Sequence, residues 1–250
     1  MIKLDKNSSC GAIIIVRLKS KRLKDKALLK INRKNSIIEY IIIKLKKIFS
    51  NENIVLATSH KNKDEKLILE AKKNSINFFQ GEAIDVLKRI YLSASENNFT
   101  NVFVCTGDNP MFDLIIARKM INIHIKNKRD FTYAYGMPLG TYGWVLRTES
   151  IRKVLLKKKR KDTEIWGDFF LNNKNMKCAQ FLYKQTRYSF KKMRLTIDEK
   201  TDLMLVKKLL VLSKKLLPSL NDIEKILLKN QDIIKINSNV KQKKKPKNIY

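Results

Sequence analysis

Short apolar runs and amphipathic segments alternate along the first half of the chain. The run "AIIIV" at residues 12–16 is continuously apolar and rich in β-branched side chains, which is typical of a strand buried on both faces of a sheet. Residues 35–49 follow with apolar side chains at helical spacing. Within them Ser36 and Glu39 stand three positions apart, as in a capping box, so we expect a helix that begins after Ser36.

The same alternation continues to residue 128 and predicts a parallel sheet. We expect strands at residues 53–59, 76–81 and 101–106, and helices at residues 63–74, 83–97 and 113–128. Strands that alternate with helices form doubly wound, mostly parallel sheets with helices on both faces, as in Rossmann-like α/β folds. In such sheets, ligands bind beyond the carboxyl ends of the strands.

The second half of the chain has a less regular pattern. It predicts strands at residues 130–135, 141–148, 178–183 and 193–197, and helices at residues 148–159, 163–173, 198–216 and 221–230. Neither an internal repeat nor a Pro/Gly-rich linker divides the sequence, so we expect a single domain at residues 1–235. Residues 236–250 include the lysine run "KQKKKPKNIY" and are expected to form a disordered basic tail.

The composition is that of a globular protein. Of the 250 residues, 44% are hydrophobic and 31% are charged, which is enough apolar material for a core. No apolar run approaches the roughly 20 residues that span a bilayer, and the first residues lack the apolar segment of a secretion signal. The three cysteines have no CxxC spacing and fit reduced thiols. These features predict a cytoplasmic protein without a membrane partner.

The net charge of +31 raises the question of a nucleic-acid partner. The basic residues are mostly lysines spread along the whole chain, and they occur together with abundant Ile and Asn. Because all three residue types have A/T-rich codons, this mixture is typical of a composition bias. Nucleic-acid modules instead concentrate basic and aromatic residues on one face. We therefore do not expect a nucleic-acid partner.

A basic loop follows the first predicted strand. The stretch "RLKSKRLKDK" places Arg17, Ser20, Arg22 and Lys26 in a strand-to-helix connection, at the edge of the sheet where a ligand would bind. Guanidinium groups bind phosphate oxygens in a bidentate manner, and an ammonium group acts as a point charge. A phosphate-binding loop and a solvated charged turn are both compatible with this pattern.

Two carboxylates also stand at the ends of predicted strands. Asp108 lies in the turn "TGDNP", and Asp198 ends the segment "RLTID". Carboxylates in such places commonly hold Mg²⁺ ions that bridge substrate phosphates. The alternative for Asp108 is a turn residue that hydrogen-bonds its own backbone. Two such carboxylates and a polybasic loop are the minimum set for metal-assisted nucleotidyl transfer.

Five segments resemble, in order, the motifs of the cytidylyltransferase family, which includes CMP-Kdo and CMP-sialate synthetases and spore-coat polysaccharide cytidylyltransferases. The segments are "IIIVRLKSKRLKDKAL", "VLATS", "FFQGEAIDVLKR", "TGDNPMFD" and "RLTIDEKTDLMLV". They span residues 12–210, and their order matches the spore-coat branch best. The resemblance implies a nucleotide-diphospho-sugar transferase fold. It also implies transfer of CMP from CTP to an acidic or surface-polysaccharide sugar, with release of pyrophosphate.

The resemblance also implies roles for individual residues. Catalytic roles fall to Arg17, Arg22, Lys26 and Asp108, with Arg22 and Lys26 offsetting charge on the leaving pyrophosphate. Asp108 and Asp198 are the implied Mg²⁺ ligands. The residues implied to bind the nucleotide are Arg17, Ser20, Arg22, Lys26, Gly81, Asp85, Arg89 and Thr106. Since relatives are often dimers, a homodimer is implied as well.

The sequence departs from the family pattern in two places. Lys19 replaces a loop glycine, and Lys24 and Asp25 replace a Pro-Gly pair, although glycine is what lets backbone N–H groups approach phosphate closely. In "PLGTYGW", Tyr142 and Trp144 stand where relatives carry acidic residues, and they are candidates for an acceptor wall or for core positions. Two alternatives follow: transfer from another nucleoside triphosphate, and a nucleotide-binding protein with weakened catalysis.

Overall fold

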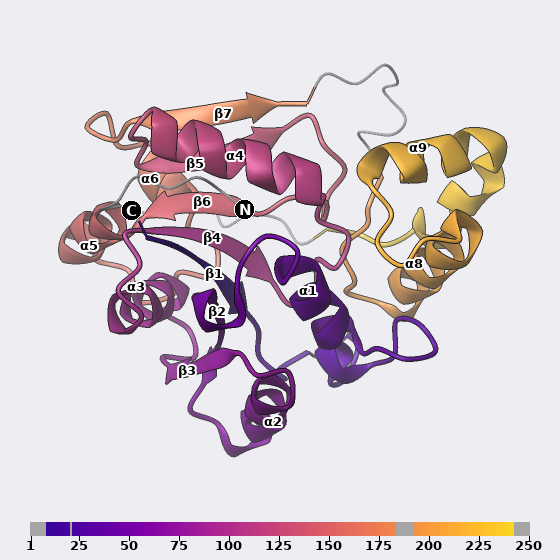
Figure 1. Ribbon diagram of the computed structural model, residues 1–250, viewed down its shortest axis with the longest axis horizontal. Helices are drawn as coiled ribbons and strands as arrows, with labels where there is room; N and C mark the ends of the chain where they lie inside the picture. Colours follow the sequence, from indigo (N-terminus) through magenta and orange to yellow (C-terminus); the bar gives the residue numbers. More distant parts are fainter. Residues whose placement is uncertain (1–8, 21, 184–192, 243–250) are drawn as a thin grey trace.

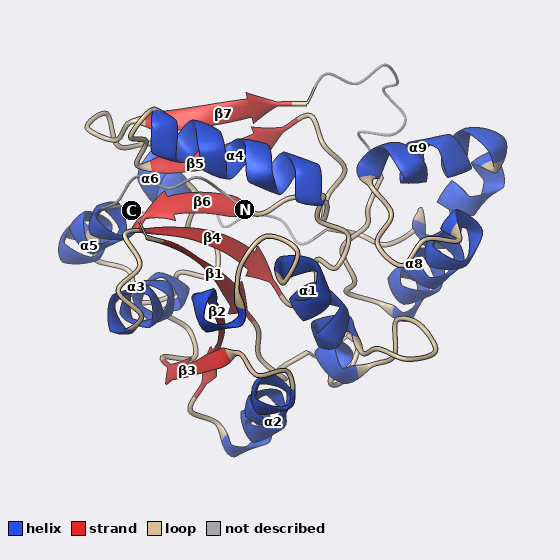
Figure 2. Ribbon diagram, viewed as in Figure 1, coloured by secondary structure: helices blue, strands red, loops and turns tan. Residues whose placement is uncertain are grey.

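A mixed sheet with helices on both faces organises the chain (Figures 1 and 2). The computed structural model describes residues 9–20, 22–183 and 193–242. The strands are β1 (Cys10–Ile15), β2 (Ile54–Ser59), β3 (Asn77–Gly81), β4 (Asn101–Thr106), β5 (Phe131–Tyr135), β6 (Trp144–Arg147) and β7 (Cys178–Leu182). Their order is β3-β2-β1-β4-β6-β5-β7, and β6 is antiparallel to both of its neighbours while the remaining pairs are parallel. The expected Rossmann-like, mostly parallel α/β sheet is confirmed.

Helices connect the strands and cover the sheet. They are α1 (Ile37–Leu45), α2 (Glu65–Lys73), α3 (Val86–Glu96), α4 (Leu114–Lys126), α5 (Thr148–Lys157), α6 (Asp168–Leu171), α8 (Lys200–Ser213) and α9 (Leu220–Lys229). Short 3-10 turns are η1 (Lys26–Leu28), η2 (Asn51–Asn53), η3 (Asn62–Asp64) and η4 (Gln231–Asn237). The predicted capping box of α1 is present, since Ser36 accepts from the Glu39 N–H at 3.2 Å and Glu39 accepts from the Ser36 N–H at 2.7 Å.

The central strand β1 separates two apolar cores. Its residues are buried throughout, and alternate side chains point to opposite faces of the sheet. Ile14 belongs to a core that includes side chains of α1, α4, α8 and α9. Ile13 belongs to the other core, with side chains of α3, α5 and α6. This double coverage explains why the strand reads as a continuous apolar run.

Two predicted elements differ in the structure. Residues 193–197 are not a strand: Leu195 donates to the Leu139 carbonyl at 2.7 Å and Ile197 donates to the Asp108 carbonyl at 2.8 Å, so this segment is bound to loops beyond the sheet. Its apolar residues reflect burial in the core rather than strand pairing. The helix predicted at residues 163–173 is reduced to the short α6, because Thr163 instead donates its backbone N–H to the Ile84 carbonyl at 3.1 Å.

The ordered structure extends past the expected domain boundary at residue 235. η4 ends at Asn237, whose side chain is buried and donates hydrogen bonds to two other residues. Residues 236–242 of the expected tail are thus described, whereas residues 243–250 lie outside the described residues. Among the helices that the structure describes, none combines the length and the apolar character needed to cross a bilayer.

Candidate active site

The basic loop after β1 is anchored at its start by a buried carboxylate. The Leu18 N–H donates to Asp64 at 2.7 Å, and the Ser59 hydroxyl donates to the other oxygen of Asp64, which is fully buried. Arg17 donates to the Ala83 carbonyl at 2.8 Å. These contacts fix the direction of the loop as it leaves the sheet. Lys21, in the middle of the loop, lies outside the described residues.

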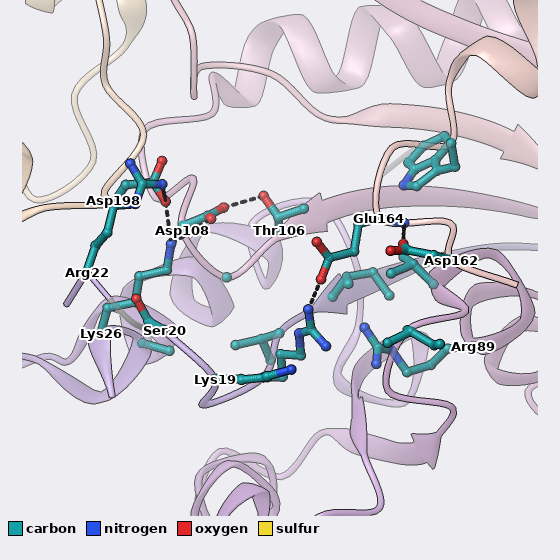
Figure 3. Close-up of a pocket in the computed structure, with 18 residues that line it drawn as sticks. Lys19, Ser20, Arg22, Lys26, Arg89, Thr106, Asp108, Asp162, Glu164 and Asp198 are labelled. Carbon is teal, nitrogen blue, oxygen red and sulfur yellow. Dashed lines mark hydrogen bonds and ion pairs between the residues drawn. The ribbon is translucent and has the colours of Figure 1, made fainter. Parts of the chain in front are cut away.

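Asp108 and Asp198 converge on the ammonium group of Lys26. Its Nζ lies 2.8 Å from Asp108 Oδ2 and 2.9 Å from Asp198 Oδ1 (Figure 3). Thr106 donates to the other oxygen of Asp108 at 2.6 Å. The tight turn between Thr106 and Asp108 requires Gly107, because a Cβ there would lie 2.5 Å from a methyl group of Val16. The structure thus brings the two predicted metal ligands together with one predicted phosphate ligand.

Two arginines complete the charge balance around Asp198. Arg22 Nη2 lies 3.0 Å from Asp198 Oδ1, and Arg194 contacts Oδ2 of the same carboxylate. Burial alone would raise the pKa of Asp198, but Lys26, Arg22 and Arg194 outweigh it and the pKa is lowered. Burial alone would lower the pKa of Lys26, but the charges of Asp108 and Asp198 outweigh burial, so the pKa of Lys26 is raised. Asp198 and Lys26 are therefore both ionised at neutral pH.

A buried lysine supports the turn that carries Asp108. Lys44, on α1, is 1% exposed and donates to the Pro110 carbonyl at 3.1 Å. Its Nζ lies 4.7 Å from the centre of the Phe112 ring, which gives a cation–π contact. Burial lowers the pKa of Lys44 to about 8, and Asp113 and Cys105 only partly offset this effect.

Arg22, Lys26, Asp108 and Asp198 line a cleft of about 750 Å³ at the carboxyl edge of the sheet. Its lining comprises Ile15, Val16, Arg17, Lys19, Ser20, Arg22, Lys26, Ala27, Ile84, Val86, Arg89, Thr106, Gly107, Asp108, Asp162, Glu164, Trp166 and Asp198. Arg22, Lys26, Asp108 and Asp198 occupy one end (Figure 3). Arg89, Asp162 and Glu164 lie at the other end (Figure 3). We call the end with the predicted metal and phosphate ligands the metal-and-phosphate pole, and the other end the second, mixed-charge pole.

Four predicted residues do not line this cleft. Gly81 ends β3 and packs beside Phe79. Asp85 caps α3 by accepting from the Lys88 N–H at 3.1 Å, and it also pairs with Lys158 at 2.6 Å. Those contacts give Asp85 a structural position. Tyr142 and Trp144 lie behind the lining, where Trp144 packs edge-on against Trp166 with ring centres 5.1 Å apart.

Arg89 lines the second pole with an unusual degree of burial. It is 1% exposed, and Nη1 donates to the Glu82 carbonyl at 2.9 Å. Its Nε has no hydrogen-bond partner within the described residues. Burial, with the nearby charge of Arg17 as the second cause, lowers the pKa of Arg89 to about 10.

Three further residues of the lining, Asp162, Glu164 and Trp166, were not predicted from the sequence. They come from the loop between α5 and α6, and Glu164 forms an ion pair with Arg17 across the cleft. Thr163 holds this loop against α3 by donating to Asp85 at 2.9 Å and accepting from the Leu87 N–H at 2.9 Å. The only signal in the sequence was a pair of acidic residues in a very basic region.

Comparison with known proteins identifies the family. A family model described as cytidylyltransferase matches residues 11–239. The chain belongs to the cytidylyltransferase family. This result confirms the resemblance in the five ordered motifs, and it makes the protein a nucleotidyltransferase that uses CTP.

Two curated relatives extend over most of the cytidylyltransferase. An uncharacterised protein of Methanocaldococcus jannaschii is 30% identical over 232 residues, which cover 92% of this chain and 95% of the relative. The spore coat polysaccharide biosynthesis protein SpsF of Bacillus subtilis is 28% identical over 203 residues, which cover 79% of this chain and 84% of the relative.

Solved structures share the fold. A cytidylyltransferase from Leptospira borgpetersenii has a TM-score of 0.84 at 23% identity, covering 94% of this chain and all of its own. The structure of CMP:2-keto-3-deoxy-manno-octonic acid synthetase complexed with CTP has a TM-score of 0.62 at 11% identity, covering 82% of this chain and 99% of its own. At sequence identities of 23% and 11%, these comparisons show a shared fold and nothing more specific.

Proposed function

We propose that this cytidylyltransferase transfers CMP from CTP to a hydroxyl group of a sugar and releases pyrophosphate. The observation that carries the proposal is the convergence of Asp108 and Asp198 on Lys26 at the end of the basic loop. A cluster of two carboxylates beside a lysine and an arginine can bind a metal–triphosphate complex and neutralise the charge that develops on it.

The residues at this pole fit a magnesium ion that is shared with a nucleotide. Among the described residues, no group of three or more His, Cys, Asp or Glu side chains is arranged to hold a metal by itself. Mg²⁺ is usually bound by one or two carboxylates together with substrate phosphates and water, so Asp108 and Asp198 are a sufficient protein contribution. When bound there, Mg²⁺ would polarise phosphate oxygens. The Lys26 ammonium at 2.8–2.9 Å shows that both carboxylates already face a single cation.

The chain's own residues then have distinct tasks. Lys26 and Arg22 exchange part of their contact with Asp198 for the phosphates and stabilise the charge on the leaving pyrophosphate. Ser20 and Lys19 line the same side of the cleft and orient the triphosphate. Thr106 holds Asp108 in place through its 2.6 Å hydrogen bond. Such catalysis depends on positioning and charge stabilisation rather than on a covalent intermediate.

The acceptor is proposed to be an acidic or surface-polysaccharide sugar, since SpsF is named for spore coat polysaccharide biosynthesis. Arg17 is proposed to bind the nucleotide, while at the second pole Arg89 can bind a carboxylate or hydroxyl oxygens of the acceptor and Trp166 offers an aromatic wall. Tyr142 and Trp144 support that wall from behind. We also propose a cytoplasmic location, from the composition and the reduced cysteines, and a homodimer, from the family resemblance.

A panel of nucleotides tests the proposal. Thermal unfolding is measured with CTP, UTP, GTP and ATP, each with and without Mg²⁺, because a ligand at 100 times its Kd adds about 2.7 kcal/mol of stability. We expect a Mg²⁺-dependent shift that is largest with CTP and absent in Asp108→Ala. Equal, Mg²⁺-independent shifts that vanish at high salt would reject the proposal, since they would reflect a basic surface only.

Weakened catalysis is a second candidate, because the phosphate loop lacks glycine and Asp25 adopts φ of +48°. Measuring pyrophosphate release in the presence of candidate sugars distinguishes an active transferase from a nucleotide-binding protein with weakened catalysis. Nucleotide binding with no release for any acidic or neutral sugar would favour the binding protein.

A further inference from the structure

The segment after α9 reaches the candidate metal site. Residues 236–250 were expected to form a basic tail. Instead, residues 236 and 237 belong to η4 (Gln231–Asn237), which packs against α8, and Asn237 is only 6% exposed. Asn237 Nδ2 donates to the backbone carbonyl of Arg194 at 3.0 Å and to Asp202 Oδ1 at 2.8 Å. Each of these two residues in turn contacts Asp198: Arg194 through its guanidinium, and Asp202 through a hydrogen bond from the Asp198 N–H.

Asp202 is the centre of this network. Its carboxylate is fully buried and accepts from the backbone N–H groups of Asp198 at 2.9 Å and Glu199 at 3.0 Å. The same carboxylate accepts from Arg194 Nε at 3.1 Å. Asp202 therefore fixes the backbone that carries Asp198, and Asn237 is one of the groups that fix Asp202.

Arg194 is the second link. It contacts the Asp198 carboxylate on the side away from Lys26, and it donates from its other terminal nitrogen to the side chain of Gln242. Gln242 comes from the residues that follow η4 and is itself exposed. The guanidinium of Arg194 is thus held between the C-terminal segment and a candidate metal ligand.

We infer that Asn237 and Gln242 are positioning residues, which hold the Asp198 carboxylate toward the metal-and-phosphate pole through Asp202 and Arg194. The inference rests on the proposed function, in which Asp198 is a metal ligand. Groups that orient a ligating carboxylate commonly change metal affinity or activity by about 10- to 100-fold when they are removed. Neither residue lines the substrate cleft, so they act on the site indirectly, through the network around Asp202 and Arg194.

The test compares three variants of the full chain. Asn237→Ala removes the buried amide. Gln242→Ala removes an exposed side chain and should fold normally even if Asn237→Ala does not. Asn230→Ala is the control, because the Asn230 side chain donates a similar bond at 2.8 Å to the carbonyl of Ile226 in α9 rather than to the network around Asp202.

The first readout is the affinity for Mn²⁺ with a non-hydrolysable CTP analogue, measured by calorimetry. We expect about tenfold weaker Mn²⁺ binding in Asn237→Ala and a smaller loss in Gln242→Ala. Asn230→Ala should stay within about twofold of wild type. Normal Mn²⁺ affinity in both folded variants would overturn the inference, as would an equal loss in Asn230→Ala.

The second readout needs no ligand. Hydrogen exchange of the peptide that covers residues 193–202 should become faster in Asn237→Ala and stay unchanged in Asn230→Ala. If the wild-type protein binds neither Mn²⁺ nor the analogue, the proposed function fails. Hydrogen exchange alone then tests whether Asn237 holds the backbone around Asp198. Unchanged exchange in this peptide would then reject the inference.

Discussion

The ammonium group of Lys26 lies 2.9 Å from a carboxylate oxygen of Asp198. Before a nucleotide enters, this contact gives Asp198, the proposed metal ligand, a counter-ion from within the protein. A ligand that carries phosphate would compete with Asp198 for Lys26, and a metal ion would compete with Lys26 for Asp198.

Replacing Lys26 is therefore expected to have opposite effects on two ligands. In Lys26→Met, CTP should bind about tenfold more weakly or worse, because a hydrogen bond to a charged group contributes about 1.5–3 kcal/mol. Mn²⁺ should bind the nucleotide-free protein more tightly, since Asp108 and Asp198 lose their shared cation. Calorimetric titration with each ligand alone checks both effects. Weaker binding of both ligands would show that Lys26 only maintains the structure.

Neutralising Glu164 is expected to strengthen CTP binding at low salt. Glu164 occupies Arg17 in a half-exposed ion pair, which a nucleotide must break or share. In Glu164→Gln we expect a gain of about two- to fivefold, since such pairs contribute about 0.2–1 kcal/mol. The gain should shrink in 0.5 M salt. Glu82→Gln removes the same charge from an exposed pair outside the cleft lining and should change little.

The buried Lys44 predicts how stability changes in mildly alkaline solution. Its folded-state pKa of about 8 lies below the ordinary value of 10.5. The unfolded state therefore binds more protons between these values, and this group makes the protein more stable as pH rises from about 8 to 10.5. Lys44→Met should lose this rise, on the order of 1–2 kcal/mol between pH 7.5 and 9.5. Urea unfolding of both proteins at the two pH values measures the difference. Parallel pH profiles would contradict it.

Gly140 is expected to be essential for the position of Asp198. It has φ of +92°, and a Cβ there would lie 2.2 Å from the backbone nitrogen of Thr196. Gly140→Ala must push the segment before Asp198 away from the site, at a cost on the order of 2–4 kcal/mol. We expect a lower midpoint in urea and loss of the Mg²⁺-dependent thermal shift.

Gly136→Ala provides the control for Gly140. Gly136 also has a positive φ, of +75°, but the nearest atom to its Cβ would be 3.3 Å away and belongs to the backbone of Tyr183 rather than to the segment before Asp198. This variant should lose about 1 kcal/mol and keep its metal response. Equal losses of the metal response in both variants would argue against a specific role for Gly140.

Local patterns predicted most of the fold. The apolar run of β1, the helical spacing of α1 and the Ser36–Glu39 capping box follow directly from nearest-neighbour geometry and burial. The segment at residues 193–197 was predicted wrongly, because the buried side chains of Leu195 and Ile197 give the same alternation whether the backbone pairs with a strand or with loops.

The convergence of Arg22, Lys26 and Asp108 could be predicted because these residues follow β1 and β4, whereas Asp198 reaches them from a segment that is not a strand. The contribution of Asp162, Glu164 and Trp166 could not be predicted, since their loop enters the cleft through the contact between Thr163 and α3. The positions of Asp85 and Asn237 were likewise set by tertiary hydrogen bonds between distant segments. Periodicity carries no information about such contacts.

The distance along the chain between Lys26 and Asp198 has a consequence for biosynthesis. Lys26 meets Asp108 across 82 positions but meets Asp198 only across 172. At about 5–20 residues per second, a ribosome needs on the order of 10–30 s to add the second carboxylate after the lysine has emerged. During that interval the nascent chain carries the basic loop without Asp198, so the loop obtains its second carboxylate only late in synthesis.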